Sequence, residues 1–291
     1  VPVPTCKGMI EVVEKVEWGL RGVIVPLITP FNDDLSVDFA GLATLVDYFI
    51  EEVGCDGLVP CGTTGESPTL SHEEHVEVIR AVVRQSKGRV PVIASAGSNS
   101  TKEAVHLTAM AAEVGADATL QVGPYYNKPT QEGLYRHFVT VAEAARLPLI
   151  IYNIPGRTSR NIEPQTIARL WADVPNVVGL KDCSNDLHQT MTIYRSTDPE
   201  TFKIYSGEDL MTLALVCHGA AGAIAAVPVR QSHNLLPQGM IAVRRWLVTI
   251  GTGTHADDAQ RMAFTQSTSC QRAYYFTACR CLHHFFLSTS R

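Results

Sequence analysis

The sequence predicts a (β/α)8 barrel, and three observations support this prediction. Eight short apolar runs, rich in Val and Ile, recur along residues 22–227, and a helix-length amphipathic segment follows each of the first seven. The Gly-x-Gly-x-x-Gly turn of a doubly wound sheet, which is the alternative fold, is absent after the early strands. With 291 residues, 45% of them hydrophobic, the chain can bury a sizeable core in one large or two medium domains.

The strands are predicted from apolar runs with little polar alternation, a pattern typical of parallel strands that are covered on both faces. In chain order the runs are Gly22–Thr29, Gly57–Cys61, Val90–Ala96, Ala118–Val122, Pro148–Asn153, Val177–Lys181, Phe202–Ser206 and Gly222–Val227. In a barrel the carboxyl ends of such strands face the active site, so residues at the ends of these runs are the first candidates for function.

The helices are predicted from apolar stripes at helical spacing and from their end signals. Asp38 can cap the first helix, Ser71 and Glu74 have the spacing of a capping box, and Gly115 ends the third helix. The predicted helices are Asp38–Glu52, Ser71–Gln85, Thr101–Val114, Gln131–Ala145, Glu163–Trp171, Asn185–Tyr194 and Glu208–Cys217.

Charge and hydropathy argue against several classes of protein. The formal net charge is −5, so no net positive field collects phosphates and we expect no nucleic-acid partner. No apolar run approaches the roughly 20 residues that span a bilayer, and Val1–Trp18 lacks the apolar stretch of a signal peptide. Four of the eight cysteines, Cys55, Cys61, Cys183 and Cys217, lie in or beside apolar segments, so we interpret them as reduced thiols of a cytoplasmic protein.

The composition changes abruptly after Val227. Residues 228–291 contain no Lys and no Glu and carry a charge of +5, whereas residues 1–227 carry −10. Helical periodicity in this last segment is poor, although a helix is needed to cover the final strand. We therefore predict an N-terminal extension at 1–18, a barrel through its eighth strand at 19–227, and an atypical C-terminal segment.

Lys181 is the first candidate catalytic residue. Among seven lysines it alone ends an apolar strand-like run, Val177–Lys181. A lysine held at the mouth of a barrel loses solvation, which disfavours the ammonium form and lowers the pKa. The neutral amine can then attack a carbonyl and form a Schiff base. Position alone leaves open a structural lysine that is paired with Asp182.

Tyr152 and Arg157 follow the fifth predicted strand. Tyr152 is the last residue but one of the run Pro148–Asn153. A phenol near a Schiff base can relay protons. Arg157 offers a planar fork that suits a carboxylate. Alternatively, Tyr152 is a core residue whose hydroxyl group is hydrogen-bonded within the protein. The alternative for Arg157 is an ordinary charged residue on a surface loop.

Two further turns carry polar or aromatic groups beside strand ends. Gly62–Glu66 (Gly-Thr-Thr-Gly-Glu) combines two glycines with two hydroxyls and can form an anion-sized nest, although an ordinary tight turn is also possible. Tyr125 and Tyr126 are adjacent, so at least one is expected at a site or at a subunit contact. We predict no metal site, because the four Cys and His side chains of Cys279–His284 are too crowded to close a tetrahedron.

Long ordered motifs resemble one family, the dihydrodipicolinate synthase family of pyruvate-dependent Schiff-base lyases. The resemblance covers about residues 19–227. The motifs are GTTGESPTLSHEEH (Gly62–His75), GSNSTKEA (Gly97–Ala104), PYYNKPTQEGLYRHF (Pro124–Phe138), YNIPGRT (Tyr152–Thr158), GLKD (Gly179–Asp182) and YSGED (Tyr205–Asp209).

The resemblance implies a reaction and a role for each matching residue. Lys181 is expected to form an imine with pyruvate, and the resulting enamine to attack L-aspartate-4-semialdehyde in the diaminopimelate route to lysine, with no cofactor. Tyr152 is expected to move protons through Thr63 to Tyr126, which in the family reaches in from a neighbouring subunit of a homotetramer. The expected substrate-binding residues are Thr64 for the pyruvate carboxylate, Arg157 for the semialdehyde carboxylate, and Gly207 and Ile224 through backbone groups.

The resemblance also implies an inhibitor site for L-lysine at a subunit interface. The matching positions are Ser67, His72, Asn99, Glu103 and Tyr125. Glu103 can pair with an ammonium group, and Tyr125 can bind a carboxylate, so these residue types suit a cationic amino acid.

Two alternative functions and one question about the chain end stay open at this point. A sister pyruvate-dependent aldolase would act on a keto-deoxy sugar acid, and an inactive barrel would serve as a binding protein. Nothing in residues 228–291 matches the family's motifs, and one shifted reading frame would explain the loss of Glu and Lys there. The nucleotide sequence tests this hypothesis, since a family-like tail in another frame would support it.

Overall fold

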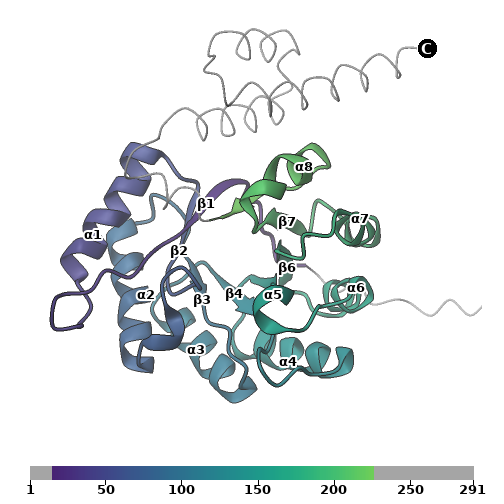
Figure 1. The fold of residues 1–291 in the computed structure, drawn as a ribbon, viewed down its shortest axis with the longest axis horizontal. Coiled ribbons are helices and arrows are strands. Elements are labelled where there is room, and N and C mark those ends of the chain that lie inside the picture. The colour runs from purple at the N-terminus through teal and green to yellow at the C-terminus, as the bar shows by residue number, and fades with distance from the viewer. Residues whose placement is uncertain (1–14, 226–291) are drawn as a thin grey trace, which may run out of the picture. The chain divides into compact units, whose positions relative to one another are not determined.

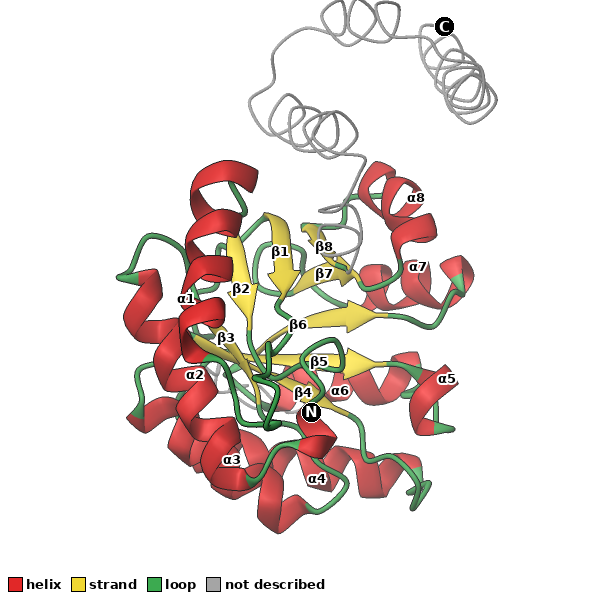
Figure 2. Ribbon diagram, turned by 60° about the vertical axis from the view of Figure 1, so that its left-hand side comes forward, coloured by secondary structure: helices red, strands yellow, loops and turns green. Residues whose placement is uncertain are grey.

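The computed structural model of the chain describes residues 15–225. In this part of the chain eight parallel strands alternate with helices, which confirms the predicted (β/α)8 barrel. Figure 1 shows the helices arranged around the strands, and Figure 2 shows the strands in the interior with helices outside them.

The strands pair in one continuous row whose two ends also meet. They are β1 (Gly22–Pro26), β2 (Gly57–Val59), β3 (Ile93–Ser95), β4 (Ala118–Val122), β5 (Leu149–Asn153), β6 (Val177–Asp182), β7 (Lys203–Ser206) and β8 (Gly222–Ile224). The order of pairing is β2–β1–β8–β7–β6–β5–β4–β3, and a parallel bridge between Leu58 and Val92 joins β2 to the start of β3. Hydrogen bonds from the Leu58 N–H to the Pro91 carbonyl (3.0 Å) and from the Ser95 N–H to the Pro60 carbonyl (3.2 Å) complete the closure.

The helices begin at the capping residues that the sequence indicates. The Asp38 side chain accepts from the Gly41 N–H, and Ser71 and Glu74 form both hydrogen bonds of a capping box. The helices are α1 (Phe39–Asp47), α2 (His72–Ser86), α3 (Thr101–Glu113), α4 (Gln131–Ala144), α5 (Pro155–Thr158), α6 (Pro164–Asp173), α7 (Leu187–Ser196) and α8 (Thr212–Cys217).

Two local differences from the sequence prediction have physical causes. The first predicted helix changes at Tyr48 into a π-helical turn, which ends at Gly54 with a left-handed φ of 68°. A four-residue helix, α5, follows β5 and was not predicted, because it begins at a proline and is too short to show periodicity. This short helix carries Arg157, one of the predicted substrate-binding residues.

The core is divided between the barrel interior and the layer under the helices. Interior residues from every strand pack together, among them Ile24, Ile93, Ile150 and Tyr205. Trp18 closes one end of this interior, where its indole N–H donates to the Tyr205 hydroxyl (2.9 Å). Two further clusters of buried residues lie between the strands and helices α1–α2 and α4–α7.

The predicted domain boundaries stay predictions. The C-terminal segment 228–291 lies outside the described residues, as do residues 1–14 of the predicted N-terminal extension.

Candidate active site

Lys181 and Tyr152 lie side by side at the mouth of the barrel. They are paired residues near the carboxyl ends of β6 and β5, and the Lys181 ammonium nitrogen Nζ is 4.3 Å from the centroid of the Tyr152 ring. Their side chains are 7% and 5% exposed, respectively. Parallel pairing of β5 with β6 therefore brings together two residues that are far apart in sequence.

Burial lowers the pKa of the Lys181 amine from its ordinary value. Desolvation is the main cause, and the negative fields of Cys183 and Asp209 oppose it in part. The shift favours the neutral amine, which is the form that attacks a carbonyl. A lysine paired with Asp182 was the alternative, but the Asp182 carboxylate instead accepts from the Thr190 hydroxyl (2.5 Å) and the Ser184 N–H (2.9 Å).

Burial raises the pKa of the Tyr152 phenol above its ordinary value. Desolvation is again the main cause, followed by the field of Cys183, while a hydrogen bond with Thr63 and the positive field of Arg157 act in the opposite direction. The phenol is therefore protonated at neutral pH. Thr63 lies in the turn that follows β2, so two strand ends and one turn supply this group of residues.

The Gly62–Glu66 turn is tightly folded. The Gly65 N–H donates to the Gly62 carbonyl (3.0 Å), and the Gly65 carbonyl accepts from the Thr29 hydroxyl (2.7 Å). A Cβ atom on Gly65 would lie 2.9 Å from the Leu27 carbonyl oxygen, so a glycine is required at that position. The turn leaves Thr63 exposed and Thr64 half-buried.

The absence of a side chain at Gly207 leaves room for the side chain of Lys181. A Cβ atom at Gly207 would lie 2.3 Å from the Cys183 sulfur and 2.9 Å from Lys181 Cε. The Gly207 N–H donates to the Asp182 carbonyl (2.9 Å), which holds the two strand ends together. Ile224, at the end of β8, is fully buried in the same interior cluster as Tyr152.

Arg157 and Tyr126 are more exposed than the other candidates. Arg157 lies on α5 with its side chain open to solvent, close enough for its charge to act on Tyr152. Tyr126 is 89% exposed and has a left-handed φ of 72°, so it packs against almost nothing of its own chain. The single chain therefore does not bring Tyr126 together with Thr63 and Tyr152.

Of the five candidate lysine-binding residues, only His72 and Glu103 contact each other directly in the single chain. The His72 ring pairs with one oxygen of Glu103, and the Ser98 hydroxyl donates to the other. The Ser98 hydrogen bond is the main cause that lowers the Glu103 pKa, so this carboxylate stays ionised at neutral pH. The Asn99 carbonyl accepts from the Asn127 side chain (3.0 Å), on the loop that also carries Tyr125.

The burial of three residues differs from what the sequence predicts. The three-residue spacing of His72 and His75 on one predicted helix favours surface or interface residues over metal ligands, but His75 is buried. Its ring contacts the Ser95 carbonyl (2.8 Å) and the Ser67 hydroxyl (3.3 Å). Its position on the apolar stripe of α2, three residues before Val78, was the signal that predicts burial. Cys183 is half-buried beside Lys181 rather than a plain core residue, and Cys217 is exposed.

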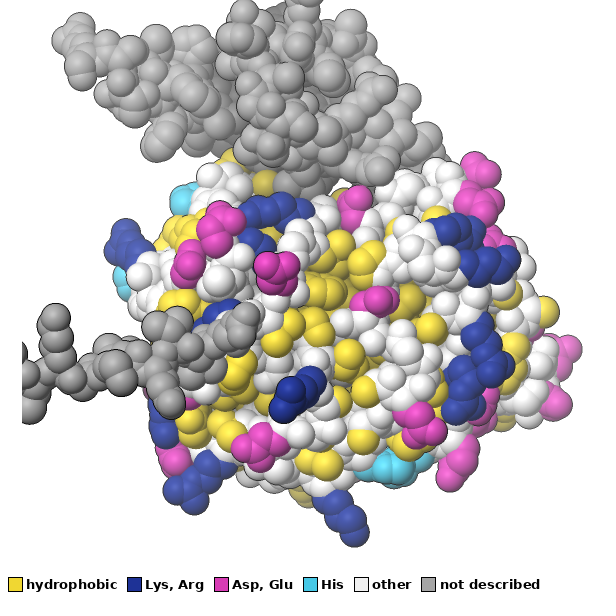
Figure 3. All heavy atoms as spheres, turned by 180° about the vertical axis from the view of Figure 1, so that it is seen from behind, with side chains coloured by type: hydrophobic (Ala, Val, Ile, Leu, Met, Phe, Trp, Pro, Cys, Tyr) yellow, Lys and Arg dark blue, Asp and Glu magenta, His cyan; other side chains and the backbone are white. Residues whose placement is uncertain are grey.

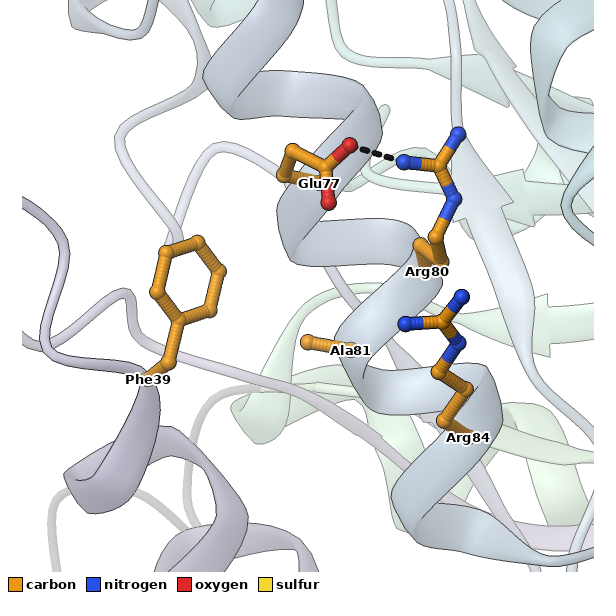
Figure 4. Close-up of a pocket in the computed structure, with 5 residues that line it drawn as sticks. All are labelled: Phe39, Glu77, Arg80, Ala81 and Arg84. Carbon is orange, nitrogen blue, oxygen red and sulfur yellow. Dashed lines mark hydrogen bonds and ion pairs between the residues drawn. The ribbon is translucent and has the colours of Figure 1, made fainter.

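A groove on the outer surface lies apart from this site. It is lined by Phe39, at the start of α1, and by the α2 residues Glu77, Arg80, Ala81 and Arg84 (Figure 4). Glu77 and Arg80 form an ion pair within it. Since none of the candidate catalytic or binding residues lines this groove, we assign it no part in the chemistry.

The grouping of metal ligands and the length of apolar helices can be judged for residues 15–225. No three His, Cys, Asp or Glu side chains in residues 15–225 are grouped to hold a metal ion, and no helix there could cross a bilayer. On the face shown in Figure 3, acidic and basic side chains are interspersed around a largely hydrophobic centre. Such a mixture gives no field of a single sign on that face.

A buried amine beside a phenol at adjacent strand ends of a (β/α)8 barrel is the arrangement that a Schiff-base lyase needs. The model of the "Dihydrodipicolinate synthetase family" matches residues 19–243, which is more than half of the chain and continues past Val227. The chain therefore belongs to this family, and the resemblance seen in the sequence is confirmed. The expectation that nothing after residue 227 resembles the family is wrong for residues 228–243.

Known relatives agree with this assignment. A 4-hydroxy-tetrahydrodipicolinate synthase of Maridesulfovibrio salexigens is 49% identical over 228 residues, which cover 77% of this chain and 75% of that protein. A dihydrodipicolinate synthase of Acinetobacter baumannii, solved in complex with pyruvate, has a TM-score of 0.74 and 41% identity over 83% of this chain and 79% of its own. The enzyme of Cyanidioschyzon merolae, solved with lysine bound, has a TM-score of 0.74 and 36% identity over 91% and 89% of the two chains.

Proposed function

We propose that the chain condenses pyruvate with L-aspartate-4-semialdehyde to give 4-hydroxy-tetrahydrodipicolinate, a step of lysine biosynthesis. One observation carries the proposal: the amine of Lys181 is buried, and its pKa is lowered, beside the Tyr152 ring at the barrel mouth. The names of the relatives favour this substrate pair over the sugar acids of a sister aldolase. The intact Lys181–Tyr152 arrangement argues against an inactive barrel.

The first half of the proposed reaction activates pyruvate. The Lys181 amine attacks C2 of pyruvate, and loss of the carbonyl oxygen as water leaves a protonated imine. This imine draws electrons from C3, which then loses a proton and becomes an enamine. Thr63 and Thr64 hold the pyruvate carboxylate through their hydroxyl and backbone groups, and Tyr152 carries protons to and from the reacting atoms.

The second half joins the two substrates. The enamine carbon attacks the aldehyde carbon of the semialdehyde, and the aldehyde oxygen takes a proton from Tyr152 to become a hydroxyl group. The amino group of the semialdehyde then attacks C2, which closes the ring and releases the Lys181 amine. Arg157 binds the semialdehyde carboxylate with its guanidinium group. Every group is supplied by the protein or the substrates, so we propose that no cofactor takes part.

Assembly is the second element of the proposal. An exposed aromatic side chain at a left-handed φ, as at Tyr126, costs free energy of order 1–3 kcal/mol unless a contact holds it. We propose that a partner subunit of a homotetramer receives Tyr126, where it joins Thr63 and Tyr152. Analytical ultracentrifugation of the wild-type chain and of Tyr126→Ala tests this step, and a monomeric wild type that is fully active would contradict it.

Regulation is the third element. We propose that L-lysine binds at Ser67, His72, Asn99, Glu103 and Tyr125, with its ammonium group on Glu103. The ionised Glu103 carboxylate and the exposure of His72 support this site. Calorimetry at millimolar lysine is expected to show binding that Glu103→Gln removes, and the absence of any heat of binding to the wild type would overturn the proposal.

Borohydride trapping tests the central chemistry. Treatment with pyruvate and borohydride is expected to add one reduced pyruvyl group, located on Lys181 by peptide mass mapping. Lys203 is an internal control, because it is also buried but donates to the carbonyls of Pro199 (2.7 Å) and Glu200 (3.0 Å) at the other end of β7. Labelling of Lys203, or no labelling at all, would contradict the proposal. A coupled assay with semialdehyde against keto-deoxy sugar acids then decides the second substrate.

A further inference from the structure

A network of side-chain amides, buried at Asn153 and Gln189 and half-buried at Asn161, lies behind the Arg157 loop. Asn153, the last residue of β5, is fully buried, and its amide donates to the Asn161 side-chain oxygen (2.9 Å). Asn161 in turn donates to the Gln189 side-chain oxygen (2.6 Å) and accepts from the Gln189 amide (3.2 Å). The three side chains come from a strand end, from the loop after α5 and from α7.

The network closes the loop that presents Arg157. This loop, residues 154–162, leaves β5 and returns to it, because the Ile162 N–H donates to the Asn153 side-chain oxygen (3.1 Å). Within the loop the buried Thr158 hydroxyl contacts the carbonyls of Ile154 (3.1 Å) and Arg160 (2.8 Å). Arg157 therefore extends from a compact loop whose base is fixed by the amides.

The same turn of α7 also fixes the strand that carries Lys181. Gln189 contacts Asn161, and its neighbour Thr190 donates to the buried Asp182 carboxylate (2.5 Å), one residue after Lys181. One helical turn thus sets the position of the Arg157 loop relative to the nucleophile. Polar groups in a closed, buried network hold a single geometry, because each broken hydrogen bond leaves a buried group unsatisfied.

We propose that the Asn161–Gln189 pair is a positioning element for the second substrate, acting through the Arg157 loop. The inference rests on the proposed function, in which Arg157 binds the semialdehyde carboxylate. Neither amide reaches the substrate itself. Their role is to place the guanidinium group at a fixed distance from the enamine that forms on Lys181, so that the aldehyde carbon meets C3 of pyruvate.

Gln189→Met tests the pair, because it keeps side-chain length and removes both hydrogen bonds to Asn161. The KM for semialdehyde is expected to rise about tenfold. The KM for pyruvate and the rate of borohydride trapping with pyruvate are expected to stay within about twofold, since Lys181 is unchanged. Gln165→Met, an exposed glutamine on the neighbouring helix α6, is the matched control and is expected to change neither constant.

The Arg157→Ala background separates positioning from general stability. Arg157→Ala alone is expected to raise the semialdehyde KM, and Gln189→Met is expected to add almost nothing in that background. An additive effect, an equal rise in both KM values, or no effect of Gln189→Met would overturn the inference. Gln189→Glu keeps the hydrogen bond that is accepted from Asn161 but cannot donate one. A smaller rise in the KM for semialdehyde is therefore expected. This variant decides the question if Gln189→Met does not fold.

Failure of the proposed function gives a different pattern. If pyruvate does not label wild-type Lys181, or the wild type does not turn over semialdehyde, the proposed function is wrong. If both occur and Gln189→Met leaves the semialdehyde KM unchanged, only the inference about the amide pair is wrong.

Discussion

The Lys181 Nζ atom lies 4.3 Å from the centre of the Tyr152 ring, on the neighbouring strand. The face of an aromatic ring attracts a cation, yet burial at this site disfavours the charged amine. Desolvation is the largest cause of the lowered Lys181 pKa, and the negative fields of Cys183 and Asp209 oppose it. The ring thus covers the buried Lys181 amine, while its hydroxyl group is hydrogen-bonded with Thr63.

Tyr152→Phe is expected to separate imine formation from turnover. The ring that covers Lys181 is retained and only the hydroxyl group is lost, so pyruvate trapping should persist. Turnover is expected to fall about a hundred- to ten-thousandfold, as is usual when a general acid–base group is removed. Mass spectrometry after borohydride treatment and steady-state rates measure the two effects, and a variant with normal turnover would exclude Tyr152 as the proton carrier.

Asp209→Asn is expected to move the pH profile of imine formation to lower pH. The negative field of Asp209 raises the Lys181 pKa against the effect of burial, so its removal lowers that pKa further. More of the amine is then neutral at any given pH below its pKa. The rate of borohydride trapping, measured against pH, reports the shift. Asp198→Asn, at an exposed position, is the control. A shift of the profile to higher pH would contradict the effect assigned to the charge of Asp209.

Gly207→Ala is expected to block the nucleophile. The new Cβ atom would lie 2.3 Å from the Cys183 sulfur and 2.9 Å from Lys181 Cε, so one of the two side chains must move. Pyruvate trapping should therefore fall strongly. Cys183→Gly in the same chain removes the closer contact and is expected to restore part of the labelling, whereas full labelling of Gly207→Ala alone would show that the pocket adapts.

His137 is expected to make the fold sensitive to acid. Burial lowers its pKa to about 4, whereas the unfolded chain has an ordinary histidine pKa of about 6.5. Between these values the unfolded state binds more protons, so the free energy of unfolding falls as pH decreases through 6.5, by at most about 3 kcal/mol in total. Denaturant unfolding at several pH values should show this slope in the wild type and a flatter one in His137→Gln, with exposed His188→Gln as control.

Local patterns predicted much of the fold. Continuous Val- and Ile-rich runs marked the eight strands, and the Ser71–Glu74 spacing marked the start of α2, because both signals lie within a few residues of sequence. The π-helical turn at Tyr48 and the short helix at Pro155 have no comparable signal. Their backbone depends on tertiary contacts rather than on periodicity.

Strand ends also predicted the centre of the site, but not its supporting residues. Lys181 and Tyr152 were found because each stands near the end of an apolar run. The Asn161–Gln189 pair was missed because 28 residues separate its members, and isolated polar residues on a loop and a helix show no pattern until the fold joins them. Sequence reasoning treated Cys183 as a small apolar residue, although its place after Lys181 had put it beside the pocket.

The closure between β2 and β3 has a consequence for the dynamics of the barrel. β5 and β6 share five paired residues, whereas one bridge and two flanking hydrogen bonds join β2 to β3. Pro60 and Pro91 stand at this seam and have no N–H to donate, so the ladder is interrupted there. The barrel should therefore open first along this line, and the amide hydrogens of Leu58 and Ser95 should exchange with solvent deuterium sooner than those in the middle of β5.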